Sequence, residues 1–314
     1  MSAANDIVGA VKAIIPLLNE EDTSVMLVHI PRLKERLTHL SNCFSKDVQH
    51  SIAVKTNPHP EVLAQLVKWG YGLEAASLEE VRLAQDAGCP GSKIIFDSPV
   101  KTRAEIALVC QEPKMLVNVN SIEELARFPQ EVLCTLGIRV NPQVHTGAPE
   151  MFDVSKNESK FGVAVTERTQ IIEAALSYPV SALHIHSGSQ MKDLEVQRIA
   201  LESLRDLAHE INTRLPGKIS VLDIGGGLPS ESMKDQTKMK AYGSLVTEVF
   251  KGCSFKLVTE FGQWVHAEAG FALSRIEYKL APNRLFIHLG ADFFMRDAYT
   301  TPRSFPFSVW NSNG

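Results

Sequence analysis

The feature of this sequence that most constrains its fold is a repeated alternation of short apolar runs with segments of helical periodicity. Eight apolar runs fall in the middle of the chain, and they are Ser51–Val54, Tyr71–Leu73, Lys93–Phe96, Met115–Val119, Leu136–Val140, Ala182–Ile185, Ser220–Ile224 and Phe255–Thr259. Runs that are apolar on both faces suit strands of a sheet covered by helices. Successive parallel strands need a crossover, which is usually a helix. The pattern therefore predicts eight parallel strands.

The segments between these runs carry helix signals. Five of them are predicted as helices, and they are Pro60–Trp69, Ser77–Ala87, Ser121–Arg127, Glu167–Leu176 and Val196–Leu215. Two open with a serine followed three residues later by a glutamate, the capping-box pattern that satisfies free N–H groups at a helix start. Gly88 follows one of these two, where glycine commonly ends a helix.

Two architectures accommodate this order, a closed β/α barrel and an open doubly wound sheet. The alternating region is close to the ~250 residues typical of a barrel. An open sheet usually places its glycine-rich phosphate loop after the first strand, whereas Gly225-Gly226-Gly227 follows the seventh. Barrels often bind phosphate after strands seven and eight. We therefore predict a (β/α)8 TIM-like barrel over residues 25–269.

The two ends of the chain differ from this region. Residues 270–314 contain three candidate strands without long helices between them, and these are Ala272–Leu280, Arg284–His288 and Phe293–Met295. We interpret this segment as the start of a β-rich second domain that is truncated. The N-terminal segment, residues 1–24, is a candidate to pack on that domain.

Composition excludes several classes of function. The chain has 314 residues and a formal net charge of −4, which gives no reason to expect nucleic acid or an anionic membrane as a partner. No apolar stretch approaches the ~20 residues of a membrane span, and the first residues lack the blocks of a secretory signal. Five cysteines without CxxC spacing are typical of free thiols in a reducing compartment. We expect a cytoplasmic protein.

Polar or glycine residues end most of the apolar runs. They are Lys55, Glu74, Asn118, Arg139, His186 with Ser187-Gly188-Ser189, Gly225–Gly227, and Glu260 with Gly262. Because the C-terminal strand ends of a barrel converge on one mouth, we expect these residues around one ligand. An amine, an acid, a histidine and a triple glycine best suit an aldehyde cofactor that carries a phosphate and a basic ring nitrogen.

Lys55 and the triple glycine each have a chemical and a structural interpretation. A lysine attacks an aldehyde when its amine is neutral, and partial burial and the nearby cation Arg139 would lower its pKa. Alternatively, Lys55 pairs with Glu74 or lies along the surface. Gly225–Gly227 leaves backbone N–H groups open to a phosphate, or forms only a tight turn. No Gly-Lys-Ser/Thr follows, which disfavours a nucleotide P-loop.

The acid and the histidines also have two interpretations each. Glu260 could stabilise a protonated ring nitrogen, which makes the ring an electron sink, or could be an ordinary ion-paired acid. His184 and His186 share one strand face, but two histidines need a third ligand, and no acid at suitable spacing identifies itself. We therefore predict no metal site, a ring-stacking role for His186 and a core position for His184.

These motifs resemble those of the fold-type III pyridoxal-phosphate decarboxylases, which act on diaminopimelate, ornithine and arginine. The similar stretches are Ala53–Asn57, Gly72–Glu80, Ser159–Gly162, His186–Gln190, Leu222–Gly227 and Glu260–Gly262. They cover most of residues 25–300 in the right order. The His-x-Gly-Ser-Gln and Ser-Lys-Phe-Gly motifs look closer to the diaminopimelate branch than to the ornithine branch. Carrier-linked amino-acid decarboxylases share them.

The resemblance implies a role for each matched residue. Lys55 would bond to the aldehyde of pyridoxal 5'-phosphate, His186 would stack on its ring, and Glu260 would pair with its nitrogen. Glu74 and Arg139 would tune and orient the ring and the lysine. Ser189, Gly227 and Gly262 would hold the phosphate, and Gly225, Gly226 and Gln263 would be further cofactor-binding residues. The implied reaction is decarboxylation of an amino acid to an amine and carbon dioxide, with Lys55, His186 and Glu74 as catalytic residues.

Two departures from the family pattern bear on activity. The family usually has Glu-Pro-Gly-Arg where this chain has Glu260-Phe261-Gly262-Gln263, and the missing arginine removes a phosphate or substrate-carboxylate contact. The family also continues past the position of Gly314, and that part supplies a Cys-Asp pair and a tyrosine to the shared sites of a head-to-tail homodimer. The chain is therefore expected to be a fragment of a longer enzyme or a truncated homologue.

Three functions follow from these observations. The first is the decarboxylase, which the presence of Lys55, Glu260 and the glycine loop favours. The second is a catalytically silent regulatory homologue that pairs with a full-length relative, which the short C-terminus favours. The third is an amino-acid racemase on the same barrel, which needs a second base that the sequence does not identify.

Overall fold

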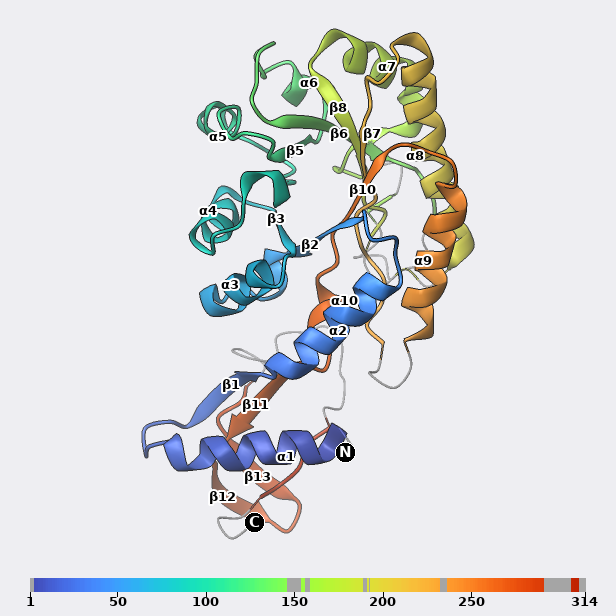
Figure 1. Ribbon diagram of the computed structural model, residues 1–314. Coiled ribbons are helices and arrows are strands. Elements are labelled where there is room, and N and C mark those ends of the chain that lie inside the picture. Colours follow the sequence, from blue (N-terminus) through green and yellow to red (C-terminus); the bar gives the residue numbers. More distant parts are fainter. Residues whose placement is uncertain are drawn as a thin grey trace. The chain divides into compact units, whose positions relative to one another are not determined.

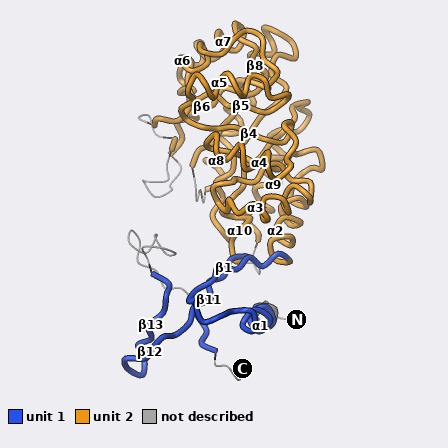
Figure 2. Tube along the Cα trace, turned by 90° about the vertical axis from the view of Figure 1, so that its left-hand side faces the viewer, with its two compact units in different colours: residues 1–30, 269–314 blue, residues 31–268 orange. Residues whose placement is uncertain are grey.

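The computed structural model describes residues 3–145, 154–155, 159–188, 191, 193–231, 236–290 and 306–310. The chain divides into two compact units, and Figure 2 shows them in different colours. One unit comprises residues 31–268, and the other combines residues 1–30 with 269–314. The larger unit carries the predicted strand-end residues.

The larger unit is built on eight parallel strands that close into a barrel (Figure 1). In order around the barrel they are β2 (Gln49–Ala53), β3 (Gly72–Ala75), β4 (Ile94–Phe96), β5 (Leu116–Val119), β6 (Thr135–Asn141), β8 (Val180–Ile185), β9 (Val221–Asp223) and β10 (Lys256–Thr259). The sheet closes because β5 pairs with β6 and β10 pairs with β2. This closure confirms the predicted TIM-like barrel and rules out the open sheet.

Helices follow most of the strands and lie outside them (Figure 1). They are α2 (Ile30–Asn42), α3 (Pro60–Lys68), α4 (Leu78–Asp86), α5 (Arg103–Val109), α6 (Ile122–Leu125), α7 (Arg168–Ser177), α8 (Leu194–Arg214), α9 (Thr237–Val249) and α10 (Gln263–His266). The five predicted helices are present as α3, α4, α6, α7 and α8. The helices α2, α5, α9 and α10 were not predicted from the sequence.

The predicted caps form as their sequences indicate. Ser77 Oγ accepts from the N–H of Glu80 at the start of α4, and Ser121 Oγ accepts from the N–H of Glu124 at the start of α6. The missed helix α5 begins with a complete capping box made by Thr102 and Glu105, so its N-terminal signal was present in the sequence.

The barrel interior is filled by apolar residues below the strand ends. Ile95, Leu116, Ala182 and Val258 come from four different strands and form one buried cluster. Barrels are packed by such inward layers rather than being hollow. The apolar residues occupy the body of the strands, so the polar residues that follow them lie at the C-terminal mouth.

A two-residue strand, β7 (Val163–Ala164), pairs in parallel with the C-terminal end of β6. Its pairing brings the preceding Phe161 beside Arg139, whose guanidinium carbon lies 4.5 Å from the centre of the phenyl ring. The Ser-Lys-Phe-Gly motif therefore adjoins the mouth of the barrel.

The smaller unit consists of α1 (Ala3–Ile14) and short antiparallel strand pairs. The strands β1 (Ser24–Val28) and β11 (Gly270–Ser274) pair with each other, as do β12 (Ile276–Ala281) and β13 (Arg284–Ile287). The expected strand over 272–280 is interrupted at Arg275, whose N–H donates to the carbonyl of Thr23. The expected strand Phe293–Met295 lies outside the described residues. Among the helices that the structure describes, none has the length and apolar character of a membrane span.

Candidate active site

Lys55 lies on a single helical turn, η2 (Val54–Thr56), that directly follows β2. Its Nζ is 3.3 Å from Oε2 of Glu74, which stands on the neighbouring strand β3. The lysine side chain is 60% exposed, whereas that of Glu74 is 2% exposed. The amine is therefore paired with a buried acid and remains open to an incoming ligand.

The pKa of Lys55 moves in the direction opposite to the sequence-based expectation. Surrounding protein removes water from the amine, which lowers its pKa, but the carboxylates of Glu74, Glu260 and Asp97 outweigh this and raise it. The expected lowering by Arg139 is wrong because its guanidinium is bound to Asp97, with 2.9 Å between Nη1 and Oδ2. Burial raises the pKa of Glu74, against the opposing effect of Lys55. Glu74 is therefore placed to take the proton that Lys55 must lose.

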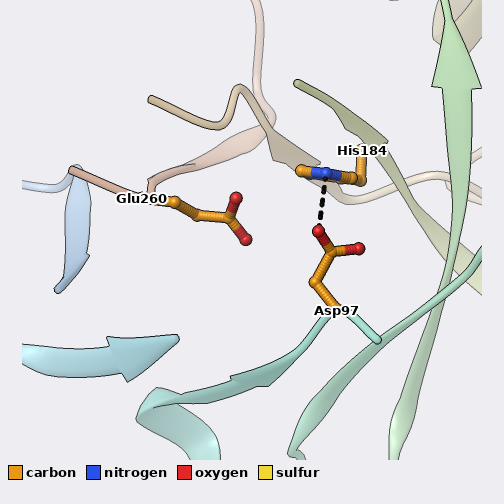
Figure 3. A group of neighbouring side chains, drawn as sticks. All are labelled: Asp97, His184 and Glu260. Atoms are coloured by element: carbon orange, nitrogen blue, oxygen red, sulfur yellow. Dashed lines mark ion pairs between the residues drawn. The ribbon is translucent and has the colours of Figure 1, made fainter. Parts of the chain in front are cut away.

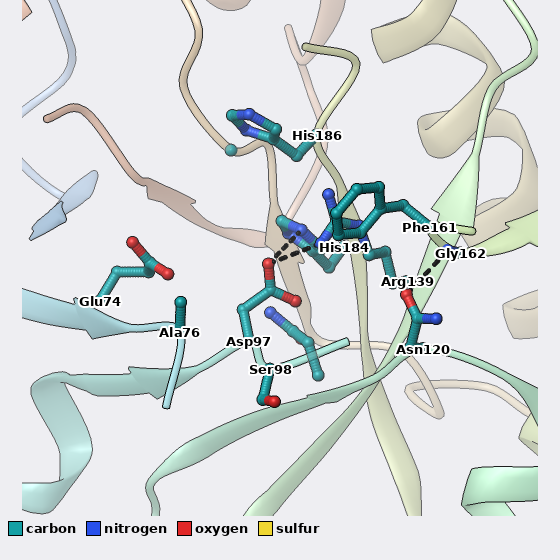
Figure 4. A network of polar contacts seen from close by, with 12 residues as sticks. Glu74, Ala76, Asp97, Ser98, Asn120, Arg139, Phe161, Gly162, His184 and His186 are labelled. Atoms are coloured by element: carbon teal, nitrogen blue, oxygen red, sulfur yellow. Dashed lines mark hydrogen bonds and ion pairs between the residues drawn. The ribbon is translucent and has the colours of Figure 1, made fainter. Parts of the chain in front are cut away.

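Behind this pair lies a buried network of charges that reaches across the barrel (Figure 4). Asp97 follows β4 and binds both Arg139 and His184, whose Nε2 lies 3.4 Å from its Oδ2. The other imidazole nitrogen, Nδ1, lies 3.2 Å from Oδ2 of Asp223. Asp223 also accepts from Nδ2 of Asn118 at 3.1 Å. The network links residues that follow or lie on five different strands.

Asp97 was not among the predicted site residues, although it shares their pattern of a polar residue directly after an apolar run. Asp97 is the first residue after the apolar run that ends at Phe96. Asn118, by contrast, was predicted to be a ligand residue of the mouth. The structure instead buries Asn118 completely, where it contacts Asp223 in the barrel interior.

Glu260 follows β10 and carries a buried carboxylate, one oxygen of which has no partner among the described residues. The residue is 7% exposed, and its Oε1 has no hydrogen-bond partner among the described residues. Figure 3 shows the carboxylate directed toward His184 and Asp97. Burial and then the charge of Asp223 raise the pKa of Glu260 well above its usual value. Such an oxygen is suited to a ligand that brings its own N–H donor.

The triple glycine packs so closely that side chains are excluded. A Cβ at Gly225 would meet the carbonyl of Ile185, one at Gly226 the carbonyl of Glu260, and one at Gly227 the carbonyl of Gly188. Gly225 and Gly227 also adopt left-handed backbone conformations, with φ of +64° and +103°, which favour glycine. The loop is therefore held between the ends of β8 and β10.

Two of these glycines use their N–H groups within the protein. Gly225 donates to Oδ1 of Asp223 at 3.0 Å, and Gly226 donates to Nδ1 of His186 at 3.3 Å. Their role here is to shape the loop and orient the imidazole. Gly227 and Gly262 stay the stronger candidates for phosphate contacts, and the predicted contact Ser189 lies outside the described residues.

His186 is held as a neutral ring at the end of β8. Burial, together with the charges of Arg139 and Lys55, lowers its pKa well below the usual value. Since Nδ1 accepts from the N–H of Gly226, the ring proton belongs on Nε2. A neutral, oriented imidazole is suited to stacking on a flat ligand.

Gly262 and Gln263 connect this mouth with an adjacent pocket. A Cβ at Gly262 would meet Oγ1 of Thr56, the residue next to Lys55. Gln263 begins α10 and lines a pocket of about 550 Å³ with Thr56, Ser230, Glu231, His266, Ala267 and Glu268. The structure places the predicted residue Gln263 beside this pocket.

Asp97, His184 and Glu260 deserve comparison with a metal site, because their ligand atoms all lie within 4.8 Å of one another. The sequence analysis saw no acid that could complete such a site, and the fold brings two together. However, both imidazole nitrogens of His184 already face carboxylates. Although burial opposes it, Asp97, Asp223 and Glu260 raise the pKa of His184 well above its usual value. A doubly protonated imidazole would have no lone pair for a metal, so these carboxylates favour an ion-paired His184 over a metal-binding one.

Comparison with known proteins decides the family. Residues 30–267 match the model of the pyridoxal-dependent decarboxylases, specifically their pyridoxal binding domain. The chain belongs to this family. The cofactor of the family is pyridoxal phosphate, as the sequence motifs predicted.

The curated relatives that the chain matches include two bacterial diaminopimelate decarboxylases. The protein from Zymomonas mobilis is 30% identical over 238 residues, and that from Pseudomonas aeruginosa is 33% identical over 239. In both cases the match covers 72% of this chain and 56% of the relative. The chain thus spans little more than half the length of these relatives.

Solved structures share the fold. The diaminopimelate decarboxylase of Helicobacter pylori complexed with L-lysine has a TM-score of 0.80 at 22% identity, covering 89% of this chain and 74% of the other. The lysine/ornithine decarboxylase of Vibrio vulnificus complexed with cadaverine has a TM-score of 0.78 at 19% identity, covering 100% and 83%. At these identities the likeness concerns the fold.

The residues at the mouth fit pyridoxal phosphate. Lys55 offers an accessible amine for its aldehyde. The buried Oε1 of Glu260 lacks a partner among the described residues, and a protonated ring nitrogen would supply one. Neighbouring backbone carbonyls occupy the Cβ positions of Gly225, Gly226 and Gly227, so this loop brings bare backbone to the mouth. Each part of the cofactor therefore has a chemically matched group in this chain.

Proposed function

We propose that this chain is the cofactor-binding portion of a pyridoxal-phosphate-dependent amino-acid decarboxylase of the diaminopimelate/ornithine type. The observation that carries the proposal is the convergence of three groups at the ends of neighbouring barrel strands. These are the amine of Lys55 after β2, the carboxylate of Glu260 after β10, and the loop Gly225–Gly227 after β9. Among the described residues, Oε1 of Glu260 has no hydrogen-bond partner. The family match over residues 30–267 supports the same cofactor.

The bound cofactor would supply an electron sink for the electron pair left when a substrate loses its α-carboxylate. Lys55, after passing a proton to Glu74 at 3.3 Å, would replace the aldehyde oxygen, which would leave as water. Glu260 would hold the proton of the ring nitrogen through its free oxygen. His186 would cover one face of the ring as a neutral imidazole, and Gly227, Gly262 and Ser189 would contact the phosphate.

Arg139 is proposed to orient this site rather than to hold the phosphate. Its guanidinium is bound by Asp97 on one side and lies over Phe161 on the other. Two partners fix a planar cation more firmly than one. Arg139 therefore shapes the wall between the ends of β4 and β6.

The substrate class is proposed from the relatives. Those named here are diaminopimelate decarboxylases, and the fold neighbours have been solved with L-lysine and cadaverine. These names support a diaminopimelate-like, ornithine-like or carrier-linked amino acid as substrate. Gln263 stands where the family usually has an arginine. The loss of that contact argues against simple specificity for diaminopimelate.

The wider organisation is also a proposal. We assign residues 25–269 to the cofactor-binding barrel and residues 270–314 to the start of a β domain on which residues 1–24 pack. A homodimer with shared sites in the cytoplasm suits the family resemblance. The five free cysteines suit a reducing compartment.

The first experiment tests the cofactor assignment. The purified chain is titrated with pyridoxal phosphate, reduced with borohydride and digested for peptide mass analysis. We expect a visible absorption band and a reduced adduct on Lys55, because its amine is accessible and adjoins Glu260 and the glycine loop. Lys55→Ala should lose both signals, whereas Lys251→Ala, a change of an exposed lysine, should keep them.

A folded chain that shows no band, or that carries the label on another lysine, would contradict the assignment. Activity is then measured as carbon dioxide release from a panel of amino acids, with and without a longer relative. Release by the chain alone supports the decarboxylase. Release only in mixtures would support a regulatory homologue instead, and exchange of the Cα proton without release would indicate a racemase.

A further inference from the structure

His184 on β8 is completely buried and lies between two carboxylates. Its Nε2 is 3.4 Å from Oδ2 of Asp97, and its Nδ1 is 3.2 Å from Oδ2 of Asp223. A neutral imidazole carries a single N–H, so it would turn a lone pair toward one of these oxygens. An imidazolium attracts both carboxylates by charge, although neither nitrogen makes an aligned hydrogen bond with the described residues. The two ion-pair contacts together therefore favour a charged ring.

Other donors also contact the two flanking acids. Arg139 Nη1 lies 2.9 Å from Asp97, and Asn118 Nδ2 and the N–H of Gly225 lie 3.1 Å and 3.0 Å from the oxygens of Asp223. Although burial opposes ionisation, Arg139 and His184 lower the pKa of Asp97 below its usual range. The carboxylate of Asp97, paired with two cations, therefore favours the charged form of His184.

Glu260 differs from both aspartates in its hydrogen-bond partners. Its ligand atom lies within 4.8 Å of those of His184 and Asp97 (Figure 3), but its Oε1 accepts no hydrogen bond from the described residues. Without a cation at His184, three carboxylates on the ends of β4, β9 and β10 would compete for the same protons. The cation prevents this by binding two of them.

We propose that His184 is a positioning residue, a buried cation that binds Asp97 and Asp223 and thereby leaves Glu260 available to the ring nitrogen of the cofactor. The inference rests on the proposed function for the identity of that nitrogen. The charge of His184 does not depend on that function, because the acids that favour it, Asp97 and Asp223, belong to the chain itself.

The first test reads this charge without cofactor. Nitrogen-15 NMR of the imidazole groups is recorded on the cofactor-free protein at pH 8, and His184 is assigned by its loss in His184→Asn. We expect both nitrogens of His184 to be protonated at this pH. A single-tautomer neutral ring would overturn the proposal whether or not the protein binds pyridoxal phosphate.

The second test reads the effect on bound cofactor. The groups that face His184 are Asp97, Asp223, Glu260 and, through Asp97, Arg139. Removing a positive charge here raises the pKa of every neighbouring acid and amine. We therefore expect His184→Asn to move the pH midpoint of the cofactor's visible band upward by about one pH unit or more. His209→Asn, on the outer helix α8, should leave the midpoint unchanged.

A compensating variant separates charge from packing. His184→Asn combined with Asp223→Asn removes one positive and one negative charge, and the amide oxygen can still accept from Gly225. We expect the midpoint to return toward the wild-type value, with circular dichroism confirming that each variant is folded. No shift in the single variant, or no return in the double variant, would overturn the proposal. Absence of any band in the wild-type chain would instead refute the cofactor assignment and leave the NMR result standing.

Discussion

Glu74 and Glu260 have the same side chain, yet the barrel gives them different electrostatic roles. Burial raises the pKa of both carboxyl groups. At Glu74 the amine of Lys55 opposes this rise, whereas at Glu260 the charge of Asp223 adds to it. Glu74 is thus suited to exchange a proton with Lys55, and Glu260 to meet a ligand that carries its own proton.

The triple glycine allows a prediction at a single residue. Gly227→Ala should weaken pyridoxal phosphate binding at least tenfold, because the new Cβ would meet the carbonyl of Gly188 and φ is +103°. Gly217→Ala is the matched control, since Gly217 also has a positive φ, +76°, but no atom lies within 4 Å of its Cβ position. The control should lose about 1–2 kcal/mol of stability for the backbone alone and keep its cofactor affinity. Cofactor titration and thermal denaturation of both variants are the measurements, and equal affinities would contradict the prediction.

At the scale of elements, the barrel closes where its last strand, β10, pairs with its first, β2. The register pairs Val258 with Gln49 and Thr259 with His50. Side chains reinforce it, since His50 Nδ1 lies 2.8 Å from Thr259 Oγ1 and Lys256 Nζ lies 2.8 Å from Gln49 Oε1. A buried histidine in this pair of strands makes closure of the barrel sensitive to acid.

Burial lowers the pKa of His50 to about 4, from 6.5. Below pH 6.5 the unfolded chain therefore binds a proton that the folded chain rejects, so stability is present above pH 6.5 and is lost as pH falls toward 4. The loss should approach about 3 kcal/mol, at about 1.4 kcal/mol per pKa unit. Urea unfolding at pH 7 and pH 4.5 should show a smaller acid loss for His50→Gln than for the wild type. An equal loss in both proteins would show that His50 is not responsible.

At the scale of the whole molecule, the chain combines a complete barrel with a small β unit and spans 56% of the curated relatives named above. The proposed shared sites require two chains for activity. Sedimentation equilibrium should therefore give twice the mass of one chain under conditions in which carbon dioxide is released. Full activity from a monomer would contradict the shared-site proposal.

Sequence alone predicted the barrel and the polar and glycine residues at the ends of its strands. Both predictions rest on local properties, namely the apolar character of a strand and the residue that follows it. Lys55, Glu74, Arg139, His186, Gly225–Gly227 and Glu260 all follow or lie on the strands expected of them. Local signals were also overlooked, since helices α2, α5, α9 and α10 and the strand-end residue Asp97 were not predicted.

Only the tertiary structure decided how these residues are paired. Three findings depend on which strands are neighbours and on their register. They are the direction of the Lys55 pKa shift, the Glu260 oxygen without a partner among the described residues, and the position of His184 between Asp97 and Asp223. Electrostatic interactions are set by distances through space, and closing a barrel brings together charges that are far apart along the chain. A linear pattern can thus name the residues at the mouth, but it cannot assign their protons.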